Sequence, residues 1–247
     1  MKKTLTILSI FIFLFSFKIN AQQVFLEKVN IEFAKTVAVW PLMKEISPVW
    51  FDQFKNSYPK ETISYFSFQS DGNKSLYKRT KEPDIPRNSG FRPFADENIV
   101  YNDYLAGTTI SQKSAYDDII LLQDSLLNIQ WQITADTRNI AGFECRKAVG
   151  ILFDTIAVFA FYTDEIMVTG GPEGINGLPG MILGVGIPRL HTTWFATKVA
   201  LASDADIRSI APATKGNKTN RPKMVTLLDN ATKGWQWGRK MFLALLL

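Results

Sequence analysis

Apolar and polar residues alternate along most of the chain, and this pattern predicts β-strands. In Val24–Trp40, residues Val29, Ile31 and Phe33 alternate with polar residues, and Pro41 ends the run. A period of two places the apolar side chains on one face of a half-buried strand. The same pattern predicts strands at Ile99–Tyr104, Thr108–Ala115, Asp118–Leu122, Ile129–Ala135, Phe143–Leu152, Thr155–Thr163, Ile166–Val168, Met181–Val185 and Thr192–Leu201.

Short turns separate these strands. Asp71-Gly72-Asn73 divides Glu61–Thr80 into a hairpin, because Asp-Gly between apolar runs favours a tight turn. Leu42–Phe54 predicts a short helix interrupted at Ser47-Pro48, and the polar segments Lys81–Phe94 and Asp204–Thr219 predict loops. We therefore expect a mainly β protein with a large curved antiparallel sheet or half-barrel.

The end of the chain changes to a helical pattern from about residue 220. Asn220 can cap a helix and Pro222 suits its first turn. Apolar residues then share one predicted face, namely Met224, Leu227, Leu228 and Ala231. The apolar residues from Trp235 to Leu247 are too few to cross a membrane. They predict packing onto the sheet, with a lid over an apolar groove or a docking tail as alternatives.

The N-terminal segment predicts export. Lys2 and Lys3 precede an apolar stretch from Leu5 to Phe17, and Ala21 offers a small residue for cleavage. We expect residues 1–21 to be a signal peptide and residues 22–247 to form one domain. The protein would then be periplasmic, associated with the outer membrane, or extracellular.

Charge and cysteine content narrow the function classes. The signal segment holds three of the 28 Lys and Arg residues and none of the 23 acidic ones, so its removal leaves a net charge of +2. No basic block remains that would indicate nucleic-acid binding. Cys145 is the only cysteine, which excludes an internal disulfide and favours a buried, hydrophobic role.

Candidate chemistry is sparse. His191 is the only histidine, and the chain contains no Gly-x-Ser-x-Gly motif, so a hydrolase with an unrecognised site is a weak alternative. Structural zinc needs about four Cys or His ligands. A soft Cu(I) site could use Cys145, Met167, Met181 and His191 if the fold brought them together. We predict no cofactor.

The segment Asn176–Gly184 has an unusual backbone composition. It contains Gly177-Leu178-Pro179-Gly180-Met181-Ile182, in which two glycines bracket a Leu-Pro pair. Glycine reaches positive φ without steric cost, and proline fixes φ. Leu178 and Ile182 would anchor this corner in the core. The motif is interpreted as architecture, with a rigid rim that grips a ligand or partner as the alternative.

These residues resemble the GLPGLI family of secreted proteins from Bacteroidetes. Met181 stands where the family motif has leucine. Upstream, Gly171-Pro172, Tyr162–Ile166 and Ile140–Ala148 match the family's Gly-Pro, Tyr-Thr-x-x-Ile and Gly-Tyr/Phe-x-Cys-x-Lys-Ala segments. Phe161 and Met167 depart from the usual Trp and Pro. The resemblance is firm from Ile129 to Val199.

The resemblance implies a place at the periplasmic or outer-membrane face and no known activity. Some members are encoded beside outer-membrane transport systems. The order of many strands and then a helix also resembles LolA-like carriers of acyl chains, at the level of fold. The sequence thus favours a non-catalytic protein that carries an apolar ligand, such as a lipid, or assists an outer-membrane transport protein. Copper handling and hydrolysis are the alternatives.

Overall fold

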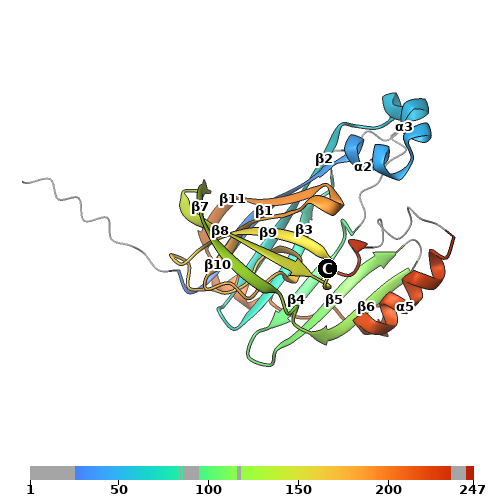
Figure 1. The fold of residues 1–247 in the computed structure, drawn as a ribbon. Helices are drawn as coiled ribbons and strands as arrows, with labels where there is room; N and C mark the ends of the chain where they lie inside the picture. The colour runs from blue at the N-terminus through green and yellow to red at the C-terminus, as the bar shows by residue number, and fades with distance from the viewer. Residues whose placement is uncertain (1–25, 84, 86–94, 116–117, 235–242) are drawn as a thin grey trace, which may run out of the picture.

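A computed structural model describes residues 26–83, 85, 95–115, 118–234 and 243–247 (Figure 1). Its strands form one 12-stranded sheet in the order β12-β6-β5-β4-β3-β2-β1-β11-β10-β9-β8-β7. Strands β12 and β7 lie at opposite edges, so the sheet is open and does not close into a barrel. The predicted fold class, a large curved antiparallel sheet with a C-terminal helix, is confirmed.

The sheet consists of two meanders that meet where β1 pairs with β11. All pairs are antiparallel except β12, which runs parallel to β6. The first meander contains β1 Val29–Ala38, β2 Glu61–Ser70, β3 Lys74–Lys81, β4 Ile99–Asp103, β5 Thr108–Ala115 and β6 Asp118–Ser125. The second contains β7 Gln130–Ile140, β8 Phe143–Leu152, β9 Ile156–Thr163, β10 Met181–Ile187 and β11 Thr192–Leu201, and β12 is Asn217–Thr219.

Short helices cover the ends of the sheet. They are α2 Val39–Ile46, α3 Pro48–Phe54, α4 Asp204–Arg208, α5 Arg221–Ala231 and the 3₁₀ turns η1 Lys55–Ser57, η2 Pro172–Gly174 and η3 Pro188–Leu190. The predicted interruption at Ser47 is confirmed, because its side chain accepts a hydrogen bond from the Trp50 backbone N–H and begins α3. The Asn220 cap of α5 is confirmed by its bond from the Lys223 N–H.

Two local predictions are wrong. The predicted loop Asp204–Thr219 contains two elements, α4 and β12. A capping box between Ser203 and Asp206 begins α4. Ile166–Val168 is not a strand, and Ile166 forms only an isolated bridge with Leu26. A two-residue capping motif and a three-residue parallel strand leave little trace in hydrophobic periodicity.

Two predicted apolar faces are narrower than expected. Ile133 is 49% exposed, because β7 is an edge strand with no neighbour on its outer side. On α5, Met224 is fully buried, but Leu227 is 59% exposed. The helix therefore contacts the sheet along a stripe near Met224 and Leu228 rather than along a broad face.

The main core forms where β1 and the second meander pack against the loop between β9 and β10. A smaller cluster joins α5 to β6 and includes Leu122, Met224 and Leu245. Leu247 belongs to the main core, so the predicted packing of the C-terminal residues onto the sheet is confirmed for Leu245 and Leu247. In Figure 1 this segment lies inside the bend of the sheet. Among the helices in the described ranges, none is long and apolar enough to span a bilayer.

Several predicted segments lie outside the described residues. They are the signal peptide at 1–21, most of the loop at 81–94, and the aromatic residues Trp235, Trp237 and Phe242.

Candidate functional site

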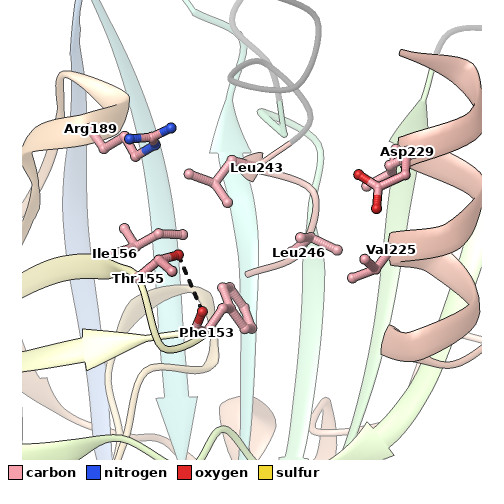
Figure 2. Close-up of a pocket in the computed structure, with 9 residues that line it drawn as sticks. Phe153, Thr155, Ile156, Arg189, Val225, Asp229, Leu243 and Leu246 are labelled. Carbon is pink, nitrogen blue, oxygen red and sulfur yellow. Dashed lines mark hydrogen bonds between the residues drawn. The ribbon is translucent and has the colours of Figure 1, made fainter. Parts of the chain in front are cut away.

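A pocket of about 440 Å³ lies between α5 and the second meander (Figure 2). Four parts of the chain form its wall: the β8–β9 turn, η3, α5 and the C-terminal segment. Apolar side chains make up most of the lining. The lining residues are Phe153, Thr155, Ile156, Arg189, Val225, Leu228, Asp229, Leu243 and Leu246.

The β8–β9 turn holds one wall in place. Phe153 and Asp154 both have positive φ, 49° and 60°, as in the type I′ turns that suit the twist of a hairpin. The Thr155 backbone N–H donates to the Leu152 carbonyl at 3.2 Å, and its hydroxyl donates to the Phe153 carbonyl at 3.3 Å. Phe153 and Ile156 are therefore presented to the pocket by a closed, hydrogen-bonded turn.

The opposite wall is α5, which is fixed to β6 at its N-terminus. The Arg221 backbone N–H donates to Asp124 Oδ2 at 2.8 Å, and Arg221 Nη1 lies 3.6 Å from Asp124 Oδ1. Burial alone would raise the pKa of Asp124, but backbone hydrogen bonds from Arg221 and Ser125 lower it below its usual value. Asp124 is therefore a charged anchor for the helix that carries Val225 and Leu228.

Two charged side chains face each other across the pocket. Arg189 from η3 and Asp229 from α5 are both exposed and lie on opposite sides in Figure 2. Within the described part of the chain, Arg189 makes no hydrogen bond or ion pair. An apolar wall with an accessible guanidinium at its edge suits a molecule with an apolar chain and an anionic end.

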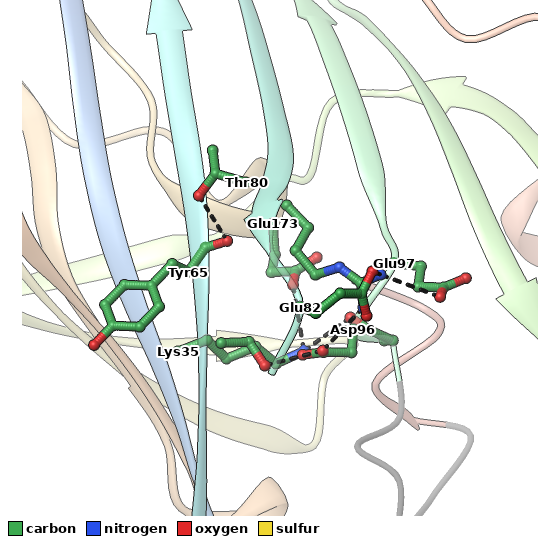
Figure 3. Close-up of polar contacts among 10 residues, drawn as sticks. Lys35, Tyr65, Thr80, Glu82, Asp96, Glu97 and Glu173 are labelled. Atoms are coloured by element: carbon green, nitrogen blue, oxygen red, sulfur yellow. Dashed lines mark hydrogen bonds and ion pairs between the residues drawn. The ribbon is translucent and has the colours of Figure 1, made fainter. Parts of the chain in front are cut away.

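A second polar feature lies inside the first meander (Figure 3). We name it the interior cluster; it consists of Lys35, Tyr77, Arg79, Asp96, Asn98, Asn102, Lys113, Glu173 and Trp194. Lys35 is 3% exposed, and its Nζ donates to the Ala95 carbonyl at 2.8 Å. The same Nζ lies 3.9 Å from Asp96 Oδ1 and 3.8 Å from Glu173 Oε1.

Asp96 and Glu173 link this cluster to neighbouring segments. Asp96 Oδ2 accepts from the Ser64 hydroxyl at 2.9 Å and from Arg79 Nη1 at 3.3 Å. Glu173 Oε2 accepts from Asn98 Nδ2 at 2.8 Å. Arg79 also pairs with Glu82 and Glu97, which lie nearer the surface and are labelled in Figure 3. The cluster thus connects the inner face of the sheet to the η2 turn.

Sequence reasoning missed the interior cluster because charged residues in a strand are usually exposed. A signal was present for Lys35. Its position has the same parity in β1 as Val29, Ile31, Phe33 and Val37, all of which are buried. A charge on the apolar face of an otherwise regular strand could have marked the site.

The glycine-proline motif lies beside the core and does not line the pocket. Leu178, Met181 and Ile182 are buried. Gly177 and Gly180 have φ of 95° and 134°, and a Cβ added at Gly180 would lie 2.1 Å from the Thr163 carbonyl oxygen. This geometry favours the architectural interpretation, because only glycine fits this backbone path.

The structure does not bring the four candidate copper ligands together. Cys145 and Met181 are buried in the main core, whereas Met167 is 62% exposed. His191 follows the far end of the seven-residue strand β10 from Met181, a separation of roughly 20 Å. Burial raises the pKa of Cys145 to about 12, which disfavours the thiolate that binds metal. No group of three or more His, Cys, Asp or Glu residues suited to a metal occurs within the described ranges.

His191 pairs with a carboxylate at the surface. Its Nε2 lies 2.6 Å from Glu45 Oε2, and its backbone is left-handed with φ of 49°. Across the described residues, no hydroxyl or thiol bonds to this imidazole. The arrangement therefore lacks the nucleophile that a histidine-dependent hydrolase requires.

Comparison with known proteins gives similarity of fold. No protein-family model and no curated protein matches the chain. A structure of PNGF-II in space group C2 aligns with a TM-score of 0.50 and 17% identity, over 78% of this chain and 30% of that one. A second PNGF-II structure, in space group P21, aligns with a TM-score of 0.50 and 16% identity, over 81% and 33%.

An uncharacterized conserved protein from Thermus thermophilus aligns with a TM-score of 0.39 and 4% identity, over 80% of this chain and 94% of that one. The present chain spans about a third of the length of the PNGF-II chains. At these identities the PNGF-II alignments show a shared fold alone.

Proposed function

We propose that this chain is an exported binding protein whose pocket holds an amphiphile with an apolar chain and an anionic end group. The observation that supports it is the pocket itself, an open cleft of about 440 Å³ lined mostly by apolar side chains from four parts of the chain. Ligand sites typically measure 300–1,000 Å³ and combine apolar walls with a few polar groups. Arg189 supplies the polar group suited to a carboxylate or phosphate.

The position of the C-terminal residues supports the same proposal. Leu243 and Leu246 line the pocket, while Leu245 and Leu247 between and after them are buried in the two cores. Different side chains of this one short segment thus complete the core and the pocket wall. This combines two of the roles predicted from sequence, packing onto the sheet and covering an apolar groove.

We further propose membership of the GLPGLI family and a place at the periplasmic or outer-membrane face, where the protein carries its ligand or assists an outer-membrane transport protein. This rests on the motif residues Gly177–Ile182 and on the N-terminal pattern of residues 1–21. The analogy to LolA-like carriers concerns the order of elements and adds support only at the level of fold.

The proposal is tested with two probes that share a chain and differ in charge, dodecanoate and dodecan-1-ol. Calorimetric titration should show binding of both to the purified protein. Val225→Trp should weaken both about tenfold, because Val225 lines the pocket and an indole would fill it. Arg189→Glu should weaken dodecanoate several-fold and leave dodecan-1-ol unchanged.

Leu227→Trp is the matched control for the filling variant. Leu227 lies on the same helix, is 59% exposed and does not line the pocket, so this variant should bind like the wild type. Absence of binding by the wild type would refute the proposal. Equal loss in Val225→Trp and Leu227→Trp would place the binding elsewhere.

A further inference from the structure

Several polar atoms of the interior cluster are buried without a hydrogen-bond partner. Within the described residues they are Asp96 Oδ1, Asn98 Oδ1, Asn102 Oδ1, Lys113 Nζ and Glu173 Oε1. Tyr77 Oη and Trp194 Nε1 are also buried, but these two groups interact with each other. Native proteins leave few such atoms, and each one needs an explanation such as a bound water, ion or ligand. Asp96 Oδ1 and Glu173 Oε1 form ion pairs with Lys35, whereas Asn98 Oδ1, Asn102 Oδ1 and Lys113 Nζ have no such partner in the described chain, which favours a site for a bound group.

Lys113 is the charged residue of this set whose burial costs the most free energy. It is 0% exposed, and its ammonium has no hydrogen-bond or ion-pair partner anywhere in the described ranges. On β5 it is paired with Ile120 of β6, and Gln112 beside it is paired with Ile99 of β4. Asn98 precedes Ile99, so the register places Asn98 next to Lys113.

Asn98 offers an acceptor without a hydrogen-bond partner beside Lys113 in the described chain. Its Nδ2 donates to Glu173 Oε2, while its Oδ1 is unpartnered, as is Lys113 Nζ beside it. The two groups therefore do not bond each other although their strands are neighbours. A bound group that reaches both would satisfy them together.

The charges immediately around Lys113 favour an anion as this group, although Glu173 already attracts its ammonium from beyond ion-pair distance. The ammonium of Lys35 is offset by Asp96 and Glu173, and the guanidinium of Arg79 is offset by Asp96, Glu82 and Glu97. Lys113 has no such counter-ion within 4.0 Å in the described chain. Desolvation lowers the pKa of Lys113 to about 8, so its charged form still predominates at pH 7.

Other polar side chains of the interior cluster lie in the same region as Lys113. Glu173 interacts electrostatically with both Tyr77 and Lys113, which places these three side chains in one region. Lys35 Nζ, next to Glu173, lies 5.7 Å from the centroid of the Trp194 ring. Within the described residues Asn98 Oδ1 and Asn102 Oδ1 are acceptors without a hydrogen-bond partner, which favours a ligand that also donates hydrogen bonds.

We propose that the inner face of β3–β5 binds a small hydroxyl-bearing anion, of the hydroxy-carboxylate or phosphate class, through Lys113. Lys113 neutralises the anion, the hydroxyl of Tyr77 is available as a donor, and the hydroxyl of the ligand donates to Asn98 Oδ1. The site is separate from the apolar pocket, and none of its residues lines that pocket. The anion site and the proposed amphiphile site can therefore be tested independently of each other.

The test measures thermal unfolding of the full chain at pH 7 with inorganic phosphate, L-lactate or acetate, against sodium chloride at equal ionic strength. A specific ligand of the folded state should raise Tm saturably by several degrees. Phosphate or lactate should do so, and acetate, which lacks a hydroxyl, should do so less. A rise in Tm with phosphate alone would assign the ligand to the phosphate class, and a rise with lactate alone would assign it to the hydroxy-carboxylate class.

Lys113→Met and Lys113→Gln should abolish the saturable rise. Lys198→Met is the matched control, because Lys198 is an exposed lysine on β11, and it should respond like the wild type. An unchanged response in both Lys113 variants would overturn the proposal. A wild type without a saturable response to phosphate or to lactate would also overturn it.

Discussion

Lys113→Met should stabilise the protein in anion-free buffer at pH 7. The ammonium of Lys113 is buried, and desolvation lowers its pKa from 10.5 to about 8. At 1.36 kcal/mol per pKa unit, this difference corresponds to about 3 kcal/mol of stability lost when the lysine is charged in the folded state. Methionine has a similar length and no charge, so the variant should recover up to about that amount.

The pH dependence follows from the direction of the shift. Between about pH 8 and 10.5 the unfolded state binds more protons than the folded state, because the folded-state pKa of Lys113 is the lower one. The stability of the wild type should therefore rise with pH across this window. The stability of Lys113→Met should lack that rise, and the gap between the two proteins should narrow.

The assay is urea unfolding at half-unit steps from pH 7 to 10, with Lys198→Met as the control. Burial raises the pKa values of Tyr77 and Tyr104, so these phenols lower stability as pH rises above about 10 in all three proteins. The difference between the wild type and Lys113→Met removes this common contribution. A Lys113→Met protein that is less stable than the wild type at pH 7, or a gap independent of pH, would refute the reasoning.

Three further predictions follow from single positions. Gly180→Ala should lower the free energy of unfolding in urea by roughly 2–4 kcal/mol, because its φ is 134° and a Cβ would clash with the backbone of Thr163. Gly107→Ala is the control, because its φ is 67° and no atom lies near the added Cβ, and it should lower the same free energy by about 1 kcal/mol. Lys35→Met should lower the free energy of unfolding by roughly 3–5 kcal/mol in the same measurement, because it leaves the buried Glu173 without its ion pair and Asp96 with Arg79 as its cation. Cys145 should react with a thiol reagent only after unfolding, since its thiol is buried and its pKa is about 12; labelling of the native protein at the rate of a free thiol would contradict this.

Hydrophobic periodicity predicted most of the sheet because its signal is local. Thr108–Ala115, Phe143–Leu152 and Thr192–Leu201 match the observed strands at both ends. Ile133 was assigned to a buried face, but a strand's position at the edge of the sheet depends on pairing between distant segments. Local alternation contains no information about that pairing.

The pocket could be predicted only in part. The apolar C-terminal residues indicated a groove or packing surface, and Leu243 and Leu246 do line the pocket. Arg189 gave no signal, because it reaches the pocket through the η3 turn between two strands. Its proximity to α5 results from the bend of the whole sheet, which no short window of sequence encodes.

The inner face of the sheet differs in chemistry between its two meanders. On β9–β11 it carries apolar residues such as Val185 and Ala160, which are paired in register, next to Trp194. On β4 and β5 the equivalent buried positions carry Asn102, Thr109, Ser111 and Lys113. Apolar residues would fill such positions at lower cost, because each buried polar atom must recover its lost hydration.

Selection for stability alone therefore does not account for the buried polar residues on β4 and β5. A chain that buries an ammonium with no hydrogen bond or ion pair in its described residues should gain stability from a single substitution, and proteins commonly give up stability in this way at sites that bind or react. Two measurements on Lys113→Met then have opposite signs if the inference is right, a gain in stability without ligand and a loss of the response to anions. A purely structural lysine would yield a loss of stability and no change in ligand response, so a single variant separates the two explanations.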